Sequence, residues 1–306
     1  MRGRDLVSID DLTPAELTAV LDRSAELKRR QRAGEPARLL AGKTLAMIFE
    51  KPSLRTRVTF EVGMRHLGGG TVNLAPADIQ LGTRESVPDV ARNLSRWVDG
   101  ILARTFAHRT VVDLAEAASV PVINGLSDWE HPCQVLADLL TIQEHLGHLD
   151  GARIAWVGDG NNVLHSLLLG AAKMGASVTA ATPPGHAPAA EVVRRAKEIA
   201  SGTGSTIAMT HDPHEAVPDA DIIYTDVWVS MGQEAERAQR LRDFAGHQVN
   251  AALLRAAGGR PKVMHCLPAH RGEEITDEVL DGPSSIVLDQ AENRLHAQKG
   301  LLALIL

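Results

Sequence analysis

Short apolar runs alternate with helix-like stretches along almost the whole chain, and this alternation constrains the fold more than any other feature. In the first half the apolar runs are 42–51, 71–75, 100–105 and 121–126. A second series starts with 151–160 and continues near 176–181, 206–210, 221–225, 262–266 and 285–289. Strands that alternate with helices are typical of a parallel sheet covered by helices on both faces.

The two series predict two α/β domains, each with a mainly parallel sheet flanked by helices, and a length of 306 residues fits two domains. A helix from His131 to about His148 joins them, so we expect domains over 1–134 and 135–290. The last segment, 291–306, reads as a helix with an apolar end. Because such an end must be covered, we expect this helix to pack back on the first domain.

Composition excludes several classes of protein. A net charge of -6 gives no basic footprint for nucleic acid or an anionic membrane. The chain has two cysteines and no CxxC pair, which argues against a disulfide framework and favours a reducing, cytoplasmic location. The N-terminal stretch lacks the apolar core of a signal peptide, and no run approaches 18 apolar residues, so we expect no membrane span.

The stretch FEKPSLRTRVTFE, residues 49–61, places two arginines where a strand turns into a helix. If Ser53 caps that helix, the free N–H groups of the first turn and the helix dipole favour an anion, and Arg55 and Arg57 complete a site for a phosphate-like dianion. The alternative is a solvated basic turn. Arg104 ends another predicted strand, where ligands of open α/β sheets bind.

The stretch LSDWEHPCQ brings together His131, Pro132, Cys133 and Gln134 at the start of the long helix. Proline at the first helical position leaves the histidine just outside the helix. A histidine and a glutamine together can polarise a carbonyl oxygen and hold an amide NH₂ group. A lone histidine would more often be structural.

The stretch VGDGNNVLHS, residues 157–166, partly matches a dinucleotide-binding loop. The third glycine position holds Val163, and no acidic residue follows the next strand, so two supports for a dinucleotide are missing. Asn161 and Asn162 instead offer amide donors and acceptors that suit a small zwitterion.

Three further candidates lie toward the C-terminus. Asp226 ends a predicted strand before the loop residues Ser230 and Met231, and could hold a ligand ammonium; alternatively it is a helix cap. Cys266 follows His265 at another strand end, where it is either a buried inert thiol or a group that orients an amine. Arg294 is a surface arginine or a ligand contact. No histidine pair has familiar metal-ligand spacing, so we expect no metal and no cofactor.

Taken together, these motifs resemble the aspartate/ornithine carbamoyltransferase family over the whole chain. The segments 53–57 and 131–134 look like its carbamoyl-phosphate motifs, while Asp226 with Ser230-Met231-Gly232, and His265-Cys266-Leu267-Pro268, look like the ornithine branch. The chain departs from many members at Leu54, where they carry threonine. The resemblance implies two α/β domains with the active site in the cleft between them, and a homotrimer.

The resemblance also implies the site residues and the reaction, which is transfer of the carbamoyl group from carbamoyl phosphate to the δ-amine of L-ornithine. Residues implied to bind carbamoyl phosphate are Ser53, Leu54, Arg55, Thr56, Arg57, Gln80, Arg104, His131, Pro132, Cys133, Gln134, Cys266, Leu267 and Arg294. Those implied to bind ornithine are Asn162, Asp226, Ser230 and Met231. Those implied at the reacting centre are Arg55, Arg104, His131, Cys266 and Arg294. The alternatives are a carbamoyltransferase for another amine such as putrescine, a nicotinamide-dependent dehydrogenase, and a non-catalytic paralogue.

Overall fold

The computed structural model describes all 306 residues and divides into two compact units. Unit 1 comprises Met1–Leu140 and Glu292–Leu306, and unit 2 comprises Thr141–Ala291. The sequence predicts the boundary at 134, whereas the division falls at Leu140, within helix α6 (Pro132–Leu146). None of the helices combines the length and the apolar character needed to cross a membrane.

Unit 1 is built on a four-stranded sheet in which every neighbouring pair is parallel. Its strands are β1 (Thr44–Phe49), β2 (Gly70–Leu74), β3 (Gly100–Arg104) and β4 (Val122–Leu126), in the order β2-β1-β3-β4. All four strands were predicted from the apolar runs. The second strand, β2, is added on one side of β1, and β3 and β4 are added on the other side. The carboxyl ends of β1 and β3 therefore lie at a topological switch point.

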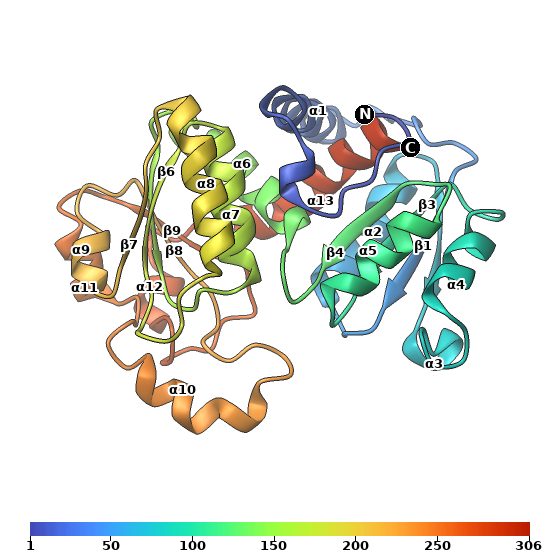
Figure 1. Cartoon of the computed structure of the whole chain (residues 1–306). Helices are drawn as coiled ribbons and strands as arrows, with labels where there is room; N and C mark the ends of the chain where they lie inside the picture. The colour runs from blue at the N-terminus through green and yellow to red at the C-terminus, as the bar shows by residue number, and fades with distance from the viewer. The chain divides into compact units, whose positions relative to one another are not determined.

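Helices cover this sheet on both faces. They are η1 (Ile9–Asp11), α1 (Pro14–Arg32), α2 (Leu54–His66), α3 (Pro76–Ile79), α4 (Val87–Leu94), α5 (His108–Ala117) and the end of α13 (Val287–Ile305). On one face, side chains of α4 and α5 pack on Ile48 and Ile101. On the other, a Cβ atom at Gly100 would lie 2.7 Å from Leu306, and one at Gly300 would lie 2.1 Å from Ser24. The C-terminal helix therefore packs against β3 and against α1, beside which it runs (Figure 1).

Helix α13 begins earlier than the sequence predicts, and the strand predicted over 285–289 is wrong. Ser285 makes one isolated parallel bridge to Val263, and the chain turns helical at Val287. The residues SIVL are apolar and partly β-branched, as a buried strand would be. A short apolar run cannot be assigned to a strand or to a buried helix by periodicity alone, and here the helix forms.

Unit 2 contains a five-stranded sheet, again parallel throughout. Its strands are β5 (Arg153–Val157), β6 (Ser177–Ala181), β7 (Ile207–Thr210), β8 (Ile222–Thr225) and β9 (Lys262–His265), in the order β7-β6-β5-β8-β9. The switch point lies between β5 and β8. Loops that follow β5, β8 and β9 therefore leave the sheet at neighbouring positions on its carboxyl edge.

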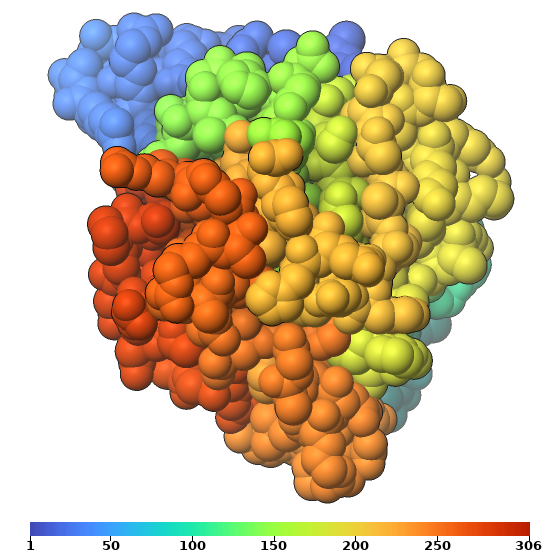
Figure 2. Space-filling view, turned by 90° about the vertical axis from the view of Figure 1, so that its left-hand side faces the viewer, coloured from blue at the N-terminus to red at the C-terminus, as the bar shows by residue number.

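Helices of unit 2 also lie on both faces of its sheet. They are α7 (Asn162–Lys173), α8 (Ala190–Thr203), α9 (Pro213–Ala216), η2 (Glu234–Glu236), α10 (Arg237–Asp243), α11 (Ala251–Ala256) and α12 (Asp277–Leu280). Helices α7 and α8 lie on one side, and α9 and α11 on the other (Figure 1). Val217 and Leu253 pack there on Ile223 of β8. The gold-to-orange part of the chain, which includes α9 and α11, is seen at the surface in Figure 2.

Candidate active site

The first turn of α2 forms one part of the candidate site in unit 1. Ser53 has extended backbone angles, and its hydroxyl oxygen accepts a hydrogen bond from the Thr56 amide at 3.2 Å, so it caps the helix as predicted. Arg55 and Arg57 follow on this turn. The positive end of the helix dipole adds to their charge, and the arrangement can hold an anion.

Arg104 and His131 lie close to that turn. Strands β1 and β3 pair with Phe49 opposite Arg104, so the arginine leaves the sheet beside the start of the loop to α2. Both side chains are buried. Burial, with the nearby charges of Arg294, Arg104 and Arg55, holds the pKa of His131 well below its usual value of 6.5. The imidazole is therefore neutral at pH 7 among three arginines, and it can donate a hydrogen bond without adding charge.

Arg294 and Gln134 form a buried network with the start of α2. The Arg294 guanidinium donates to Gln134 Oε1 at 2.7 Å and to Thr56 Oγ1 at 3.1 Å, and it is 2% exposed. Gln134 in turn donates through Nε2 to Asp138 at 2.8 Å. Both ends of the Gln134 amide are thus oriented, and Arg294 ties the first turn of α2 to the first turn of α6.

The remaining predicted residues of unit 1 are Pro132, Cys133, Leu54 and Gln80. Pro132 is the first residue of α6, and Cys133 donates its thiol to the Asn124 carbonyl at 3.3 Å. Burial raises the pKa of Cys133 to about 12, so it stays a thiol and its side chain is directed into the core. The side chain of Leu54 is 74% exposed, and Gln80 ends α3 with a left-handed φ of 45°.

A cavity of about 520 Å³ lies next to the start of α2. Ser53, Leu54 and Arg57 line it on one side, and residues 73–76 and Asp78 line it on the other. Lys51, which also lines it, places its ammonium 4.6 Å from the centre of the Phe106 ring. The charged residues in the lining are Lys51 and Arg57 together with Glu50 and Asp78, so the cavity is of mixed charge.

Three strand ends of unit 2 converge on Asp226, which follows β8. Its carboxylate accepts from Asn161 Nδ2, after β5, at 2.7 Å. It also accepts from the thiol of Cys266, after β9, at 2.9 Å, and from the amide of Val227 at 2.8 Å. Asp226 is 6% exposed. The loops predicted to bind an amine are thus joined through one carboxylate.

Asn161 belongs to this group around Asp226, and the sequence only partly indicated it. It caps α7, and its Oδ1 accepts from the amides of Val163 and Leu164 at 3.0 and 3.2 Å. Its amide nitrogen is then directed to Asp226. Asn162, which the sequence favoured, is the first residue of α7. Helix caps strongly prefer asparagine, but both positions hold asparagine, so this preference does not show which of the two is the cap.

The segment with Ser230 and Met231 leaves the sheet after Asp226. Met231 is 44% exposed, and Gly232 has a φ of 98°, which suits glycine. The segment is anchored by Arg240, whose guanidinium lies 2.6 Å from Asp159 and also donates to the Trp228 carbonyl. Burial raises the pKa of Asp159, and the charge of Arg240 opposes that rise. This ion pair was not predicted.

The loop after β9 is held from inside by His265 and Glu274, both of which are fully buried. His265 Nε2 donates to Glu274 Oε1 at 2.9 Å, and its Nδ1 accepts from the Leu267 amide at 2.9 Å. The Glu274 oxygen also accepts from the His270 amide at 2.6 Å. Leu267 has a φ of 57°, which is strained for a leucine. These contacts hold the backbone on either side of Cys266 in place.

Two groups in unit 2 bring possible metal-ligand atoms within 4.8 Å of one another: Asp226, His265 and Cys266 form one, and His270, Glu273 and Glu274 form the other. In the first, both nitrogens of His265 already make hydrogen bonds, and the Cys266 thiol donates to Asp226. In the second, Arg237 donates to both carboxylate oxygens of Glu273. A metal ion would have to replace these internal contacts.

The glycines of the loop 157–160 serve the packing of the chain. The Gly160 amide donates to the His186 carbonyl at 2.9 Å, and a Cβ atom at Gly160 would lie 2.2 Å from the Pro188 nitrogen. Only glycine fits under that backbone. In a dinucleotide-binding loop, such a glycine lets the pyrophosphate approach the backbone closely. Here the segment 186–188 occupies that position beside Gly160.

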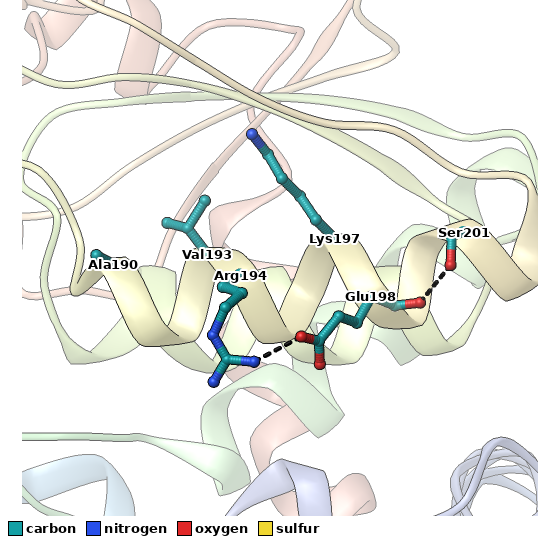
Figure 3. A pocket seen from close by; sticks show the side chains of 6 residues that line it. All are labelled: Ala190, Val193, Arg194, Lys197, Glu198 and Ser201. Carbon is teal, nitrogen blue, oxygen red and sulfur yellow. Dashed lines mark hydrogen bonds and ion pairs between the residues drawn. The ribbon is translucent and has the colours of Figure 1, made fainter.

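A further hollow runs along α8 and involves no predicted residue. Figure 3 shows Arg194 paired with Glu198 along the helix, while Lys197 points away from this pair. The guanidinium nitrogen lies 2.5 Å from the carboxylate oxygen. Pairs of this kind, four residues apart, stabilise an exposed helix. The hollow is the solvated face of one helix.

The fold and the two groups of residues define a class: a two-domain α/β protein with a cluster of arginines at a helix start in one unit and a buried carboxylate at three strand ends in the other. The model of the aspartate/ornithine carbamoyltransferase carbamoyl-P binding domain matches residues 4–144, and that of the Asp/Orn binding domain matches residues 150–305. The chain belongs to the aspartate/ornithine carbamoyltransferase family.

Individual relatives agree with this. The chain is 55% identical over 306 residues to an ornithine carbamoyltransferase of Pyrococcus horikoshii, covering 100% of this chain and 96% of the relative. It is 54% identical over 306 residues to the anabolic ornithine carbamoyltransferase of Pyrococcus furiosus, covering 100% and 97%. A solved structure of ornithine carbamoyltransferase from Pyrococcus furiosus matches with a TM-score of 0.97 and 54% identity, covering 99% of this chain and 97% of that one.

Proposed function

We propose that the protein is an ornithine carbamoyltransferase, which converts carbamoyl phosphate and L-ornithine to L-citrulline and phosphate. Family membership carries the reaction class. The observation that carries the choice of amine is the group Asp226, Asn161 and Cys266, in which a buried carboxylate accepts a thiol hydrogen bond at 2.9 Å. A carboxylate in this position favours an amino-acid ammonium.

Unit 1 would hold carbamoyl phosphate. The phosphate group would lie on the first turn of α2, against Arg55 and Arg57, where the Ser53 cap and the helix dipole are favourable for a dianion. Arg104 and the neutral His131 would donate to the carbamoyl oxygen. Gln134, oriented by Arg294 and Asp138, would hold the carbamoyl NH₂ group through its amide oxygen.

Unit 2 would hold L-ornithine. Asp226 would pair with the α-ammonium group, while Asn162 and the segment with Ser230 and Met231 would take the carboxylate end. Cys266 would stand near the δ-amine and orient it. The backbone of Leu267, fixed by the His265–Glu274 contacts, would present its carbonyl to the reacting groups.

The chemical step needs a neutral amine, because only its lone pair can attack the carbamoyl carbon. A free alkyl ammonium has a pKa of about 10.4, so desolvation in the occupied site must favour the neutral form. A C–N bond forms, the C–O bond to the phosphate breaks, and the phosphate leaves with the bonding electrons. One proton of the attacking amine ends on the departing phosphate. Arg55, Arg104 and His131 would stabilise the developing oxyanion.

Further parts of this proposal concern the setting of the enzyme. We expect a cytoplasmic enzyme that forms a homotrimer. The exposed apolar side chains Leu54, Val58 and Val72, on α2 and the edge strand β2, favour a contact between copies, with Gln80 supplied to a neighbouring site. The name of the anabolic relative favours a role in arginine synthesis. Light scattering during size-exclusion chromatography tests the trimer.

A colorimetric citrulline assay with the purified protein tests the function. It compares L-ornithine, putrescine and L-aspartate as acceptors at equal concentrations of carbamoyl phosphate. We expect turnover with L-ornithine that exceeds turnover with the other two at least a hundredfold. Putrescine keeps both amino groups of ornithine and lacks only the α-carboxylate, so equal turnover with putrescine would refute the assignment of the carboxylate end to the 230–231 segment.

A further inference from the structure

Lys299, in the C-terminal half of α13, places an ammonium group inside unit 1 without a countercharge. The residue is 2% exposed. Its Nζ donates to Gln31 Oε1 at 2.6 Å and to the Leu27 carbonyl at 3.5 Å, and no carboxylate lies within 4.0 Å of it. Buried charges in proteins are usually paired, because an isolated one is costly. Burial lowers the pKa of Lys299 to about 8.

This ammonium borders a cavity of about 290 Å³. The cavity is formed by α1, the loop 34–37, the last turn of α2 and α13. Gln31 and His66 line it together with Lys299, and His66 Nδ1 lies 3.1 Å from the same Gln31 oxygen that accepts from Lys299. Two hydrogen-bond donors therefore meet at one acceptor. Burial and the charges of Lys299 and Arg65 lower the pKa of His66.

We infer that this cavity is a binding site for a small oxyanion of the phosphate or carboxylate type. Such an anion would supply the countercharge that Lys299 lacks and would accept hydrogen bonds from Lys299 and His66. A volume of about 290 Å³ is ample for an anion of this size. The one acidic residue in the lining, Glu35, lies 3.8 Å from Arg30 and has a side chain that is 60% exposed.

The site is separate from the one proposed for carbamoyl phosphate. Ser53 and Arg55 stand at the first turn of α2, and His66 is the last residue of that helix. A helix of 13 residues is about 20 Å long, so the two anion sites are far enough apart to be titrated independently. Lys299 contacts α2 between these ends, where a Cβ atom at Gly63 would lie 3.3 Å from its Cγ.

The experiment measures binding of inorganic phosphate and of acetate to the full chain with Arg55→Ala and Arg57→Ala, which removes both arginines of the other phosphate site. Isothermal titration calorimetry gives the dissociation constant at pH 7. Adding Lys299→Met should weaken binding at least tenfold, and adding Glu35→Gln should tighten it several-fold. Lys43→Met is the matched control. Lys43 pairs with Asp99 at 2.8 Å and its side chain is 41% exposed, so this substitution should leave the dissociation constants of both anions unchanged. The anion that binds more tightly identifies the class.

A second measurement uses the unmutated lysine. Acetylation of lysine side chains with a small reagent, followed by mass spectrometry, should show that Lys299, which borders the cavity, reacts more slowly when phosphate or acetate is present, while Lys43 reacts at the same rate. No binding of either anion, binding that survives Lys299→Met, or no protection of Lys299 would overturn the inference. Neither measurement involves carbamoyl transfer, so the result is independent of the proposed function.

Discussion

The two halves of the candidate site differ in charge and in how they are built. In unit 1, Arg55, Arg104 and Arg294 surround a neutral His131, and their combined charge helps to keep that imidazole unprotonated. In unit 2, the central group is the carboxylate of Asp226, which accepts from an amide, a thiol and a backbone N–H. The charges differ accordingly: we proposed a dianion as the ligand of the first group and an ammonium group as the ligand of the second.

The two halves also differ in what holds their residues in place. The anion site uses helix starts, with Ser53 as a cap of α2 and Pro132 as the first residue of α6. The amine site uses loops that are fixed by side chains, through Arg240 with Asp159 and through Glu274 with His265. Helix starts follow local sequence rules, whereas contacts between loops do not. Substitutions in one group at a time test whether the two groups act independently.

The largest effect is expected for Arg55→Ala. Removing one donor that stabilises a developing oxyanion typically costs about a hundred- to a thousandfold in kcat. The loss should appear in kcat and in the KM for carbamoyl phosphate, and the binding of ornithine analogues should change little. Steady-state citrulline assays that vary each substrate in turn measure this. Turnover near that of the unchanged chain would refute the anion site.

Asp226→Asn should produce the opposite pattern. A hydrogen bond to a charged group contributes about 1.5–3 kcal/mol, so the KM for ornithine should rise about ten- to a hundredfold. The KM for carbamoyl phosphate should stay within about twofold, because the anion site of unit 1 does not include Asp226. The same assays apply, and an equal rise of both KM values would show that the two halves are not independent.

These contrasts explain how much of the molecule the sequence predicts. Alternating apolar runs predict the nine observed strands, and the motif 53–57 predicts the Ser53 cap. The false strand at 285–289 arises because SIVL is compatible with either a strand or a buried helix start. The contacts of Arg240 and Glu274 could not be predicted, because they join residues that are distant in sequence or lie in irregular loops and follow no periodicity.

Glu274→Ala tests whether the loop of Cys266 depends on its buried support. The substitution leaves the His265 ring and the His270 amide without their shared acceptor, and each unsatisfied buried group costs about 1–3 kcal/mol. We expect a lower free energy of unfolding by that order, together with a lower kcat. Glu274→Gln is the matched control, since it keeps an acceptor oxygen. Urea denaturation gives the free energies, and equal losses for both variants would argue against a hydrogen-bonding role.

The pH dependence of stability tests the charge of the anion site. The pKa of His131 is lowered in the folded chain, whereas in the unfolded chain it is about 6.5. Below pH 6.5, therefore, the unfolded chain binds a proton that the folded chain excludes, and the free energy of unfolding falls as the pH falls. His131→Gln removes this contribution, so the variant should lose less stability than the unchanged chain between pH 7 and pH 5. Parallel curves for the two proteins would contradict the lowered pKa.

The smallest effect is expected for Arg194→Ala, on the exposed face of α8. Arg194 pairs with Glu198 at 2.5 Å, but the two side chains are 67% and 48% exposed. An exposed pair four residues apart in a helix contributes about 0.3–0.5 kcal/mol, because water screens it and ordering both side chains costs entropy. Thermal unfolding should therefore shift by about 1 °C or less, with kcat and both KM values unchanged. A change in either KM would mean that the charge of Arg194 influences substrate binding. In that case α8 would have to be counted as a third region of the site.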